Sequence, residues 1–299
     1  MVNKAYTGKR YSEADARKLI RDFLDKNTFT EILDPRNHMV SPHFEMIGKP
    51  VEFDDGVVIG AGKLKKHSVY FAAQQGAFTG GTIGEIHGAK LVGLFRKAIV
   101  ERPDAVIVAF DSGGVRLDEA NIGLLAASEF SRAVLDARSS GINCIAMIGG
   151  AVGCYGGAAL ATKCFDYVIM NEKGRLGISG PVVIETNKGV EEFDSQDKSL
   201  VWRTFGGKNR YILGDADIFA DDTIDSFREA VLKIINKPLP INLKNAKIEQ
   251  KILAERLKKY SDCNDALDVW RKIGFTEPEQ IPGMNYDQFI KQCTPVKEV

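Results

Sequence analysis

The stretch that decides the fold is AVIVAFDSGGVRLDEANIGLLAASEFSRAVLDARSSGINCIAMI, which runs from Ala105 to Ile148. Its first six residues form an unbroken apolar run, which is typical of a strand covered on both faces. A turn with two adjacent glycines follows, then a segment with helical apolar spacing that ends at Gly141, then a second apolar run over 142–149. The alternation predicts an α/β domain with a core sheet and crossover helices.

The same pattern extends on both sides of this stretch. Downstream, a glycine-dense turn over 149–157 precedes a short predicted helix (158–164) and a further strand, DYVIM (166–170). Upstream, VVIGAG (57–62) and SVYFAAQ (68–74) predict two strands joined by a basic turn. A fold of this kind excludes the all-β barrels of chymotrypsin-type proteases.

Two further helices are predicted before the central stretch. A leader helix is expected over about 12–26, beginning at Ser12. A second helix follows Gly80 and Gly81, with Thr82 as its N-cap and Glu85 three positions on in a capping-box pattern. No internal repeat appears in the chain.

The composition is that of a globular protein with a sizeable core, because 44% of the 299 residues are hydrophobic and 27% are charged. Forty basic and forty acidic residues balance, so no global charge favours nucleic acid or an anionic membrane. The polar start does not resemble a secretory signal. The longest apolar stretch, 141–170, is interrupted by glycines and charges and is therefore interpreted as buried core.

Five cysteines occur, an odd number, and no two have CxxC spacing. Buried, reduced thiols in a cytoplasmic protein are the expected state, with no cysteine-built zinc site and no metal. After about residue 236 the composition changes to charged helices, KNAKIEQKILAERLKKY and NDALDVWRKIGF. These helices are either a solvated appendage or a surface that docks a partner.

Two glycine turns each lie between a buried strand and a helix. The first is Ser112-Gly113-Gly114, and the second contains Tyr155-Gly156-Gly157. Amides at the start of a helix lack intrahelical acceptors, and absent side chains let a ligand approach them. One donor from each turn can converge on one oxygen as an oxyanion hole. The alternative is that the glycines only permit close packing of strand and helix.

A nucleophilic role for Ser112 is disfavoured. The residue before Asp111 is a phenylalanine, and no G-x-S-x-G elbow is present. The four histidines (His38, His43, His67, His87) do not lie in recognisable catalytic settings.

The motifs resemble a known family. SGGVRLDE (112–119), FTGGTIGEIHGAK (78–90) and GISGPVVIE (177–185) are similar to segments of carboxyltransferase subunits of biotin-dependent acyl-CoA carboxylases, members of the crotonase superfamily. FDSGGVRLDEANIGL (110–124) together with EFDSQDKSLVWRTFGGKNR (192–210) resembles the β subunits of biotin-independent malonate decarboxylases. The resemblance covers most of residues 10–235. It implies a crotonase-like spiral of ββα units over 1–236 and a C-terminal helical extension over 237–299.

The resemblance also implies an activity. The substrate is a malonyl thioester on an acyl carrier protein, held through a CoA-like phosphopantetheine arm, and the products are acetyl thioester and CO2. The enolate formed on loss of CO2 is stabilised by the backbone amides of Gly113, Gly114, Gly156 and Gly157, without biotin or metal. A γ subunit of related fold completes the site. The donor of the enolate's proton is left open.

Neighbouring residues each have two interpretations. Ser112 is a candidate for the substrate site, and Arg116 either binds the departing carboxylate or forms a salt bridge with Asp118 or Glu119. Tyr155 lines the pocket or only packs. Gly80 and Gly81 shape the channel for the thioester arm or only start a helix. The lysines of the basic turn, Lys63, Lys65 and Lys66, either bind phosphates of the prosthetic arm or are solvated. The aromatic residues Trp202 and Phe205 either pack in the core or lie at an interface.

Three functions are compatible with the pattern: a malonyl-thioester decarboxylase subunit, a carboxyltransferase subunit that uses biotin, and a non-catalytic scaffold subunit. The same oxyanion hole serves the first two, so the partner distinguishes them.

Overall fold

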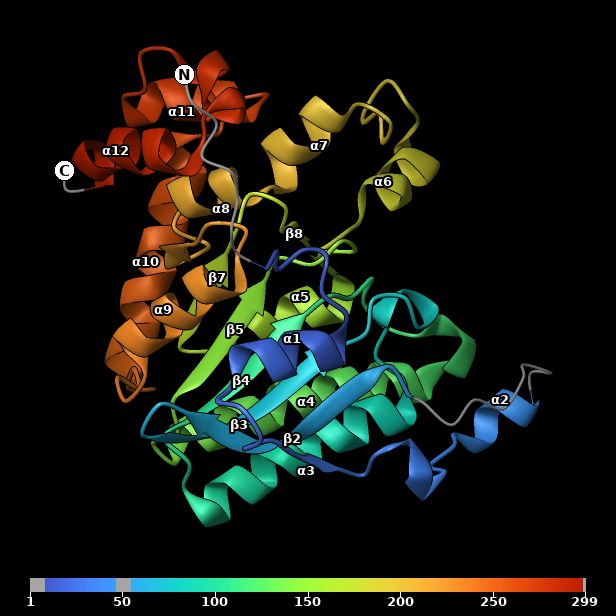
Figure 1. Ribbon diagram of the computed structural model, residues 1–299. Coiled ribbons are helices and arrows are strands. Elements are labelled where there is room, and N and C mark those ends of the chain that lie inside the picture. Colours follow the sequence, from blue (N-terminus) through green and yellow to red (C-terminus); the bar gives the residue numbers. More distant parts are fainter. Residues whose placement is uncertain (1–8, 47–54, 298–299) are drawn as a thin grey trace.

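The computed structural model describes residues 9–46 and 55–297. Its centre is a seven-stranded sheet in the order β1-β2-β3-β4-β5-β7-β9 (Figure 1). The strands are β1 (Thr30–Ile32), β2 (Val57–Leu64), β3 (His67–Gln74), β4 (Ala105–Phe110), β5 (Cys144–Ile148), β7 (Tyr167–Met170) and β9 (Ile218–Phe219).

The pairing of the strands brings the predicted turns to one edge of this sheet. Strands β1, β2 and β3 are antiparallel neighbours, whereas β3, β4, β5, β7 and β9 run parallel. Helices α3 (Glu85–Glu101) and α4 (Asn121–Ser139) are the crossovers from β3 to β4 and from β4 to β5. The carboxyl ends of these parallel strands therefore meet at one edge, where the turns begin.

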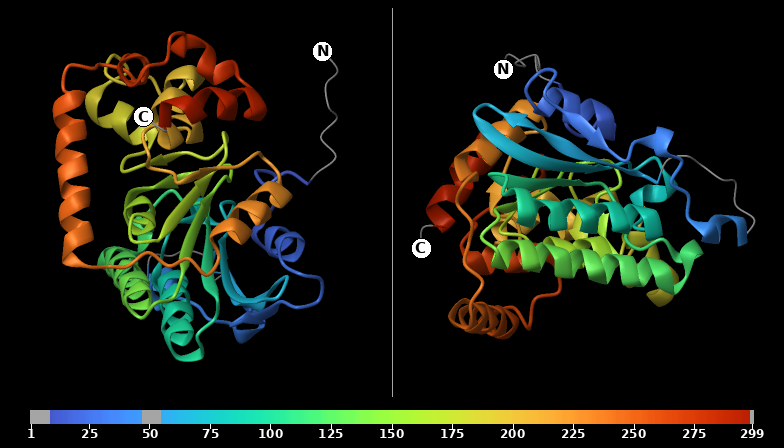
Figure 2. Two further views of the ribbon diagram at one scale, coloured as in Figure 1. Left: turned by 90° about the vertical axis from the view of Figure 1, so that its left-hand side faces the viewer. Right: turned by 90° about the horizontal axis from the view of Figure 1, so that it is seen from below.

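Helices cover both faces of the sheet, as the unbroken apolar strands predict (Figure 2). Helices α3, α4 and α5 (Gly156–Thr162) share one apolar cluster with the sheet. Helices α1 (Ala16–Phe23) and α9 (Ile224–Ile234) form a second cluster on the opposite face. All six residues of β4 are buried between the two clusters.

A small parallel pair, β6 (Cys154–Tyr155) and β8 (Leu176–Gly177), lies beyond the carboxyl edge. Helices α6 (Pro181–Lys188), α7 (Lys198–Phe205) and α8 (Gly207–Ile212) follow it. A peripheral helix, α2 (Pro42–Met46), precedes β2. Short 3-10 turns are η1 (Pro35–Asn37), η2 (Thr79–Gly81), η3 (Leu117–Glu119) and η4 (Pro278–Gly283).

The C-terminal helices are α10 (Leu243–Lys259), α11 (Ala266–Ile273) and α12 (Tyr286–Lys297). The change in composition near residue 236 falls just after α9. Helices α11 and α12 are anchored to the sheet domain, because Trp270 and Phe289 share a buried cluster with Ile212 and Phe219.

Two predicted helix starts are wrong. Helix α1 begins after Asp15, whose carboxylate accepts from Lys18 N–H, and the Ser12 hydroxyl instead donates to Asp222. Helix α3 begins after Gly84, and Thr82 does not cap it. The first eight residues of the polar start, from which no signal peptide is expected, lie outside the described residues. Among the described helices we find none that combines the length and hydropathy needed to span a bilayer.

Candidate functional site

The two glycine turns lie side by side at the carboxyl edge of the sheet. Ser112 and Cys154 form a parallel β-bridge, in which Ser112 N–H donates to Gly153 O at 2.6 Å and Tyr155 N–H donates to Ser112 O at 2.9 Å. Gly114 has a φ of 119°, which side-chain-bearing residues rarely adopt, and a Cβ on it would lie 3.3 Å from Gly156 Cα, so glycine favours this close approach. Segments about 40 residues apart are thus in backbone contact.

Three of the four proposed donor amides already have acceptors within the chain. Gly113 N–H donates to Gly80 O at 2.8 Å, and Gly114 N–H donates to the Ser112 hydroxyl at 3.2 Å. Gly156 N–H donates to Ile178 O at 3.0 Å. These bonds hold the turns in shape, and they leave Gly157 as the proposed donor whose amide finds no acceptor among the described residues.

A neighbouring amide that the sequence did not single out is also unpaired. Val115 forms a parallel bridge with Ile83, and that bridge uses Gly114 O and Arg116 N–H. Because alternate amides of a parallel strand point away from its partner, Val115 N–H is left without an acceptor in the described part of the chain. A Cβ on Gly157 would lie 2.8 Å from Val115 Cγ2. Val115, directly after the first turn, and Gly157, in the second, are therefore in contact in space, and each has an unpaired amide.

Ser112 supports the first turn. It is fully buried, and its hydroxyl accepts from Gly114 N–H. No histidine is among its hydrogen-bond partners in the described structure, which agrees with the sequence argument against a nucleophile.

Gly80 and Gly81 form the wall beside the first turn. Both have left-handed backbone conformations, with φ of 66° and 64°. A Cβ on Gly81 would lie 1.8 Å from Asp111 O, so glycine is required for this contact. Gly80 meets nothing at that position but supplies the acceptor for Gly113.

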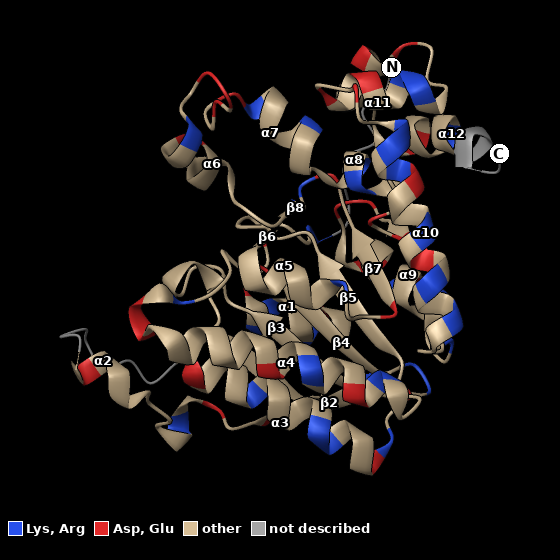
Figure 3. Cartoon of the chain, turned by 180° about the vertical axis from the view of Figure 1, so that it is seen from behind, with Lys and Arg blue, Asp and Glu red and all other residues tan. Residues whose placement is uncertain are grey.

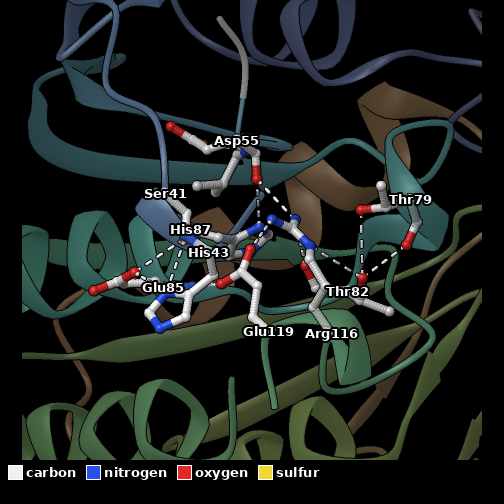
Figure 4. Close-up of polar contacts among 10 residues, drawn as sticks. Ser41, His43, Asp55, Thr79, Thr82, Glu85, His87, Arg116 and Glu119 are labelled. Carbon is white, nitrogen blue, oxygen red and sulfur yellow. Dashed lines mark hydrogen bonds and ion pairs between the residues drawn. The ribbon is translucent and has the colours of Figure 1, made fainter. Parts of the chain in front are cut away.

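Arg116 is a structural cation. It is 2% exposed and forms an ion pair with Glu119 at 3.0 Å. Its guanidinium also donates to the carbonyl oxygens of Asp55 and Thr82 (Figure 4). Of its two interpretations, the salt bridge describes the observed contacts, and the partner is Glu119.

Glu119 supplies the cap that Thr82 was predicted to provide. Its second carboxylate oxygen accepts from Glu85 N–H at the start of α3. A carboxylate at a helix N-terminus satisfies an orphan amide and interacts favourably with the helix dipole. Arg116 and Glu119 together fasten the segment after the first turn to α3.

A buried polar chain continues from this pair to the turn. His87 is fully buried, its Nδ1 lies 3.1 Å from Asp55 O, and its Nε2 lies 3.1 Å from Gln74 Nε2. Burial, with the charge of Arg116, lowers the pKa of His87 to about 3. The ring is therefore neutral and donates through Nδ1. The Gln74 side-chain oxygen accepts from Asp111 N–H.

Asp111 connects the two turns, a role that sequence reasoning missed. Its Oδ1 accepts from Val152 N–H at 2.7 Å and from Gly153 N–H at 3.1 Å. It directly precedes the first turn, and these amides lead into the second. Burial raises the pKa of the Asp111 carboxyl, while the two amide bonds oppose that rise. The available signal was an acid placed directly after a buried strand.

Of the aromatic candidates, Tyr155 and Phe205 are buried and pack together, whereas Trp202 is only partly buried. Tyr155 is buried and forms an edge-on contact with Phe205, beside Phe193 and Val201. Its hydroxyl is buried and finds no hydrogen-bond partner in the described structure. Trp202 donates from its indole to Glu172 O.

The basic turn lies far from the glycine turns. Lys65 and Lys66 precede the amino end of β3, whereas Ser112 follows the carboxyl end of the parallel strand β4. The eight residues of β3 separate the two ends by roughly 25 Å. The lysines are exposed, so the solvated interpretation fits them.

All five cysteines are free thiols, but the expectation that all are buried is wrong, because Cys164 and Cys263 are only partly buried. Burial raises the pKa values of Cys144, Cys154 and Cys164. Within residues 9–46 and 55–297, the acidic, histidine and cysteine side chains do not form a group of three or more suited to a metal ion.

The fold and the paired turns define a crotonase-like α/β protein with an amide-lined edge. Comparisons with known proteins agree. The carboxyl transferase domain family matches residues 12–252. The malonyl-S-ACP:biotin-protein carboxyltransferase of Malonomonas rubra is 38% identical, over 97% of both chains. The chain belongs to the carboxyl transferase domain family.

Solved structures place the fold in the same group. A chain of the Pseudomonas malonate decarboxylase hetero-tetramer has a TM-score of 0.80 and 35% identity, covering 89% of this chain and 98% of that one. The transcarboxylase 12S structure has a TM-score of 0.63 and 27% identity, covering 75% of this chain and 40% of that one. The predicted resemblance to this superfamily, and to malonate decarboxylases within it, is confirmed.

Proposed function

We propose that the chain is the β subunit of a biotin-independent malonate decarboxylase, a carboxy-lyase that acts on a malonyl thioester carried by an acyl carrier protein. The observation that carries the proposal is a pair of unpaired amides, Val115 N–H and Gly157 N–H, in two residues that are in contact where the glycine turns meet. The similarity to a malonate decarboxylase chain over 98% of its length supports the choice of substrate.

The proposed reaction breaks the bond between C2 of the malonyl group and its carboxylate. The electron pair of that bond forms an enolate whose negative charge resides on the thioester oxygen, CO2 departs, and a proton then adds to C2. The Val115 and Gly157 amides donate to the developing oxyanion. Each such donor contributes roughly 3–4 kcal/mol to the transition state. This assignment replaces Gly113, Gly114 and Gly156, whose amides bond within the chain.

The remaining turn residues keep those two amides in place. Ser112, Asp111 and the Gly80 carbonyl fix the turn backbones, so little reorganisation is needed during reaction. In the proposal the thioester arrives on a CoA-like phosphopantetheine arm. The proposed step needs neither biotin nor a metal ion, because backbone N–H donors stabilise the negative charge on the enolate oxygen.

A partner subunit of related fold is part of the proposal. Large aliphatic side chains flank both turns and are each more than half exposed; they are Leu117, Leu124, Leu125, Leu160, Ile178 and Val182. Apolar surface gathered in this way marks an interaction site. A solved Pseudomonas malonate decarboxylase MdcD-MdcE structure is a hetero-dimer. We therefore assign this surface to a γ subunit that completes the site.

A second candidate is carboxyl transfer to biotin. It is favoured by the Malonomonas relative, whose name describes transfer from malonyl-S-ACP to a biotin protein. The same amides would stabilise the same enolate, and only the fate of the carboxyl group would differ.

The test is release of CO2 from malonyl-S-carrier by the chain co-purified with its partner subunit, with and without avidin. Activity that persists in avidin supports the decarboxylase, whereas activity that avidin stops supports transfer to biotin. Full activity of the partner subunit without this chain would leave only the scaffold role and would refute both catalytic candidates.

A further inference from the structure

Helix α10 carries large aliphatic side chains that the rest of the described chain does not cover. Every residue from Leu243 to Glu255 is exposed, and the leucines and isoleucines among them are between 45% and 71% exposed. Arg256, near the end of the helix, reaches Asp215 at 3.5 Å. Helices in proteins usually owe their stability to a packed apolar face. A 17-residue helix in this setting is therefore suited to a partner.

The lysines of α10 form a stripe on the side away from the protein body. At about 100° per residue, Lys244, Lys247, Lys251 and Lys258 fall within about 60° of one another, while Lys259 lies to one side. Glu255 borders the stripe and forms an ion pair with Lys251 at 3.8 Å. Arg256, which faces the body through Asp215, lies roughly opposite this stripe. Leu243 and Leu257 flank the stripe on one side, and Ile248 and Ile252 on the other.

The charge of α10 selects the kind of partner. The helix has six basic and two acidic residues in a chain whose net charge is zero (Figure 3). Two copies meeting through this face would bring like charges together, which disfavours a homodimer. A helix lying on a membrane has one apolar face opposite its polar face, whereas here the side opposite the lysines carries Glu249 and Arg256 as well as Leu253, and Arg256 pairs with Asp215. An acidic protein surface fits both the charge and the flanking side chains.

We propose that the outward face of α10 docks the acidic surface of the carrier protein that delivers the thioester. This inference rests on the proposed function for the identity of the carrier. The lysine stripe guides encounter and orientation, and the flanking aliphatic side chains lose water on contact. In this arrangement the carrier protein binds at α10, and its prosthetic arm binds at the glycine turns.

The experiment measures the affinity of the complex for malonyl-S-carrier with the double variant Lys247→Glu/Lys251→Glu. Glutamate keeps the helix propensity of lysine, so circular dichroism should be unchanged. We expect the affinity to fall about tenfold or more at low salt, with a smaller difference at high salt. The matched control is Lys26→Glu/Lys63→Glu, which reverses two exposed lysines near the β1–β2 edge of the sheet, away from α10, and should bind normally.

The outcomes separate the docking surface from the catalytic proposal. Turnover of free malonyl-CoA should not change in the α10 variant, and an equal loss there would overturn docking through α10. Unchanged carrier affinity would overturn it too, as would lysine-dependent binding to phosphatidylserine vesicles in place of the carrier. If the wild-type complex binds the carrier through α10 but releases no CO2 from it, the proposed function fails and the docking surface stands.

Discussion

At the scale of single residues, the site depends on which backbone amides of the glycine turns find a hydrogen-bond acceptor within the chain and which do not. The glycines of the first turn are bound internally, and the amide left over belongs to Val115. Gly157 matters for a related reason, because its missing side chain makes room for Val115. Substitutions at two glycines should therefore differ sharply in effect.

Gly157→Ala should lower kcat about tenfold or more, whereas Gly113→Ala should stay near wild type. The new Cβ at 157 would lie 2.8 Å from Val115 Cγ2 and displace a proposed donor, while at 113 the nearest atom, Gly80 O, is 3.4 Å away. Steady-state decarboxylation by the assembled complex is the measurement. Equal activity of the two variants would contradict the assignment of Val115 and Gly157.

Asp111→Ala should lower kcat more than it lowers substrate affinity, and Asp111→Asn should restore most of the loss. Alanine leaves Val152 N–H and Gly153 N–H without their acceptor, at about 1–3 kcal/mol of stability for each unsatisfied group. Asparagine retains the accepting oxygen. The measurements are kcat, KM and urea denaturation of each variant.

The matched control is Asp166→Ala. Asp166 also accepts from two backbone amides, those of Cys144 and Leu239, but near the opposite end of β5. It should reduce stability without a selective loss of kcat. A similar selective loss in the control would show that the effect at Asp111 is general destabilisation.

At the scale of elements, α3 is attached to the site by buried polar bonds as well as by apolar packing. Glu119 accepts a hydrogen bond from the first amide of α3. His87, the third residue of the helix, forms hydrogen bonds with Asp55 and Gln74. These partners are 13 to 34 residues away in sequence. Because the ring of His87 is held neutral, the attachment depends on pH.

The free energy of unfolding should fall as the pH drops from about 6.5 toward 3. In this window the unfolded chain binds a proton on His87 that the folded chain does not bind, so stability is present above pH 6.5 and is lost as the pH falls. The slope from one proton is at most about 1.4 kcal/mol per pH unit. Urea unfolding of wild type and His87→Gln between pH 7 and 4 measures it. Identical pH slopes would refute a neutral, buried His87.

At the scale of the whole molecule, two surfaces have features of contact sites. One is the aliphatic surface around the glycine turns, and the other is α10. They differ in chemistry, because the first is largely uncharged and the second is basic. A catalytic subunit that meets both a permanent partner and a mobile carrier would need this distinction.

Leu125→Asp should weaken assembly with the partner subunit while the isolated chain keeps its stability within about 0.5 kcal/mol. Leu125 is 58% exposed beside the turns, so its burial belongs to an interface. The control is Val100→Asp, an 80% exposed position near the far end of α3. Size-exclusion chromatography of the co-expressed subunits measures assembly. Normal assembly of the Leu125 variant would place the interface elsewhere.

Local pattern alone determined the central strands and helices of this protein, from β2 to β7, and their order. Apolar runs such as 105–110 mark buried strands, and the strand–turn–helix alternation leads to a parallel sheet with its turns at one edge. These features depend on periodicities within ten or twenty residues, which is why they could be read directly. The resemblance to carboxyltransferases came from the same motifs.

Only the tertiary structure decided which amides are free, which acid pairs with Arg116 and where the basic turn lies. The acceptor of Gly113 N–H is Gly80, 33 residues earlier, and Arg116 also donates to Asp55, 61 residues earlier. Hydrogen-bond acceptors are limited, and each is claimed by whichever donor the folded chain brings near it. Every residue except proline has a backbone N–H, so the sequence cannot show which amide is unpaired. The Val115 amide could be identified as a donor only from the hydrogen bonds that its neighbours make in the folded structure.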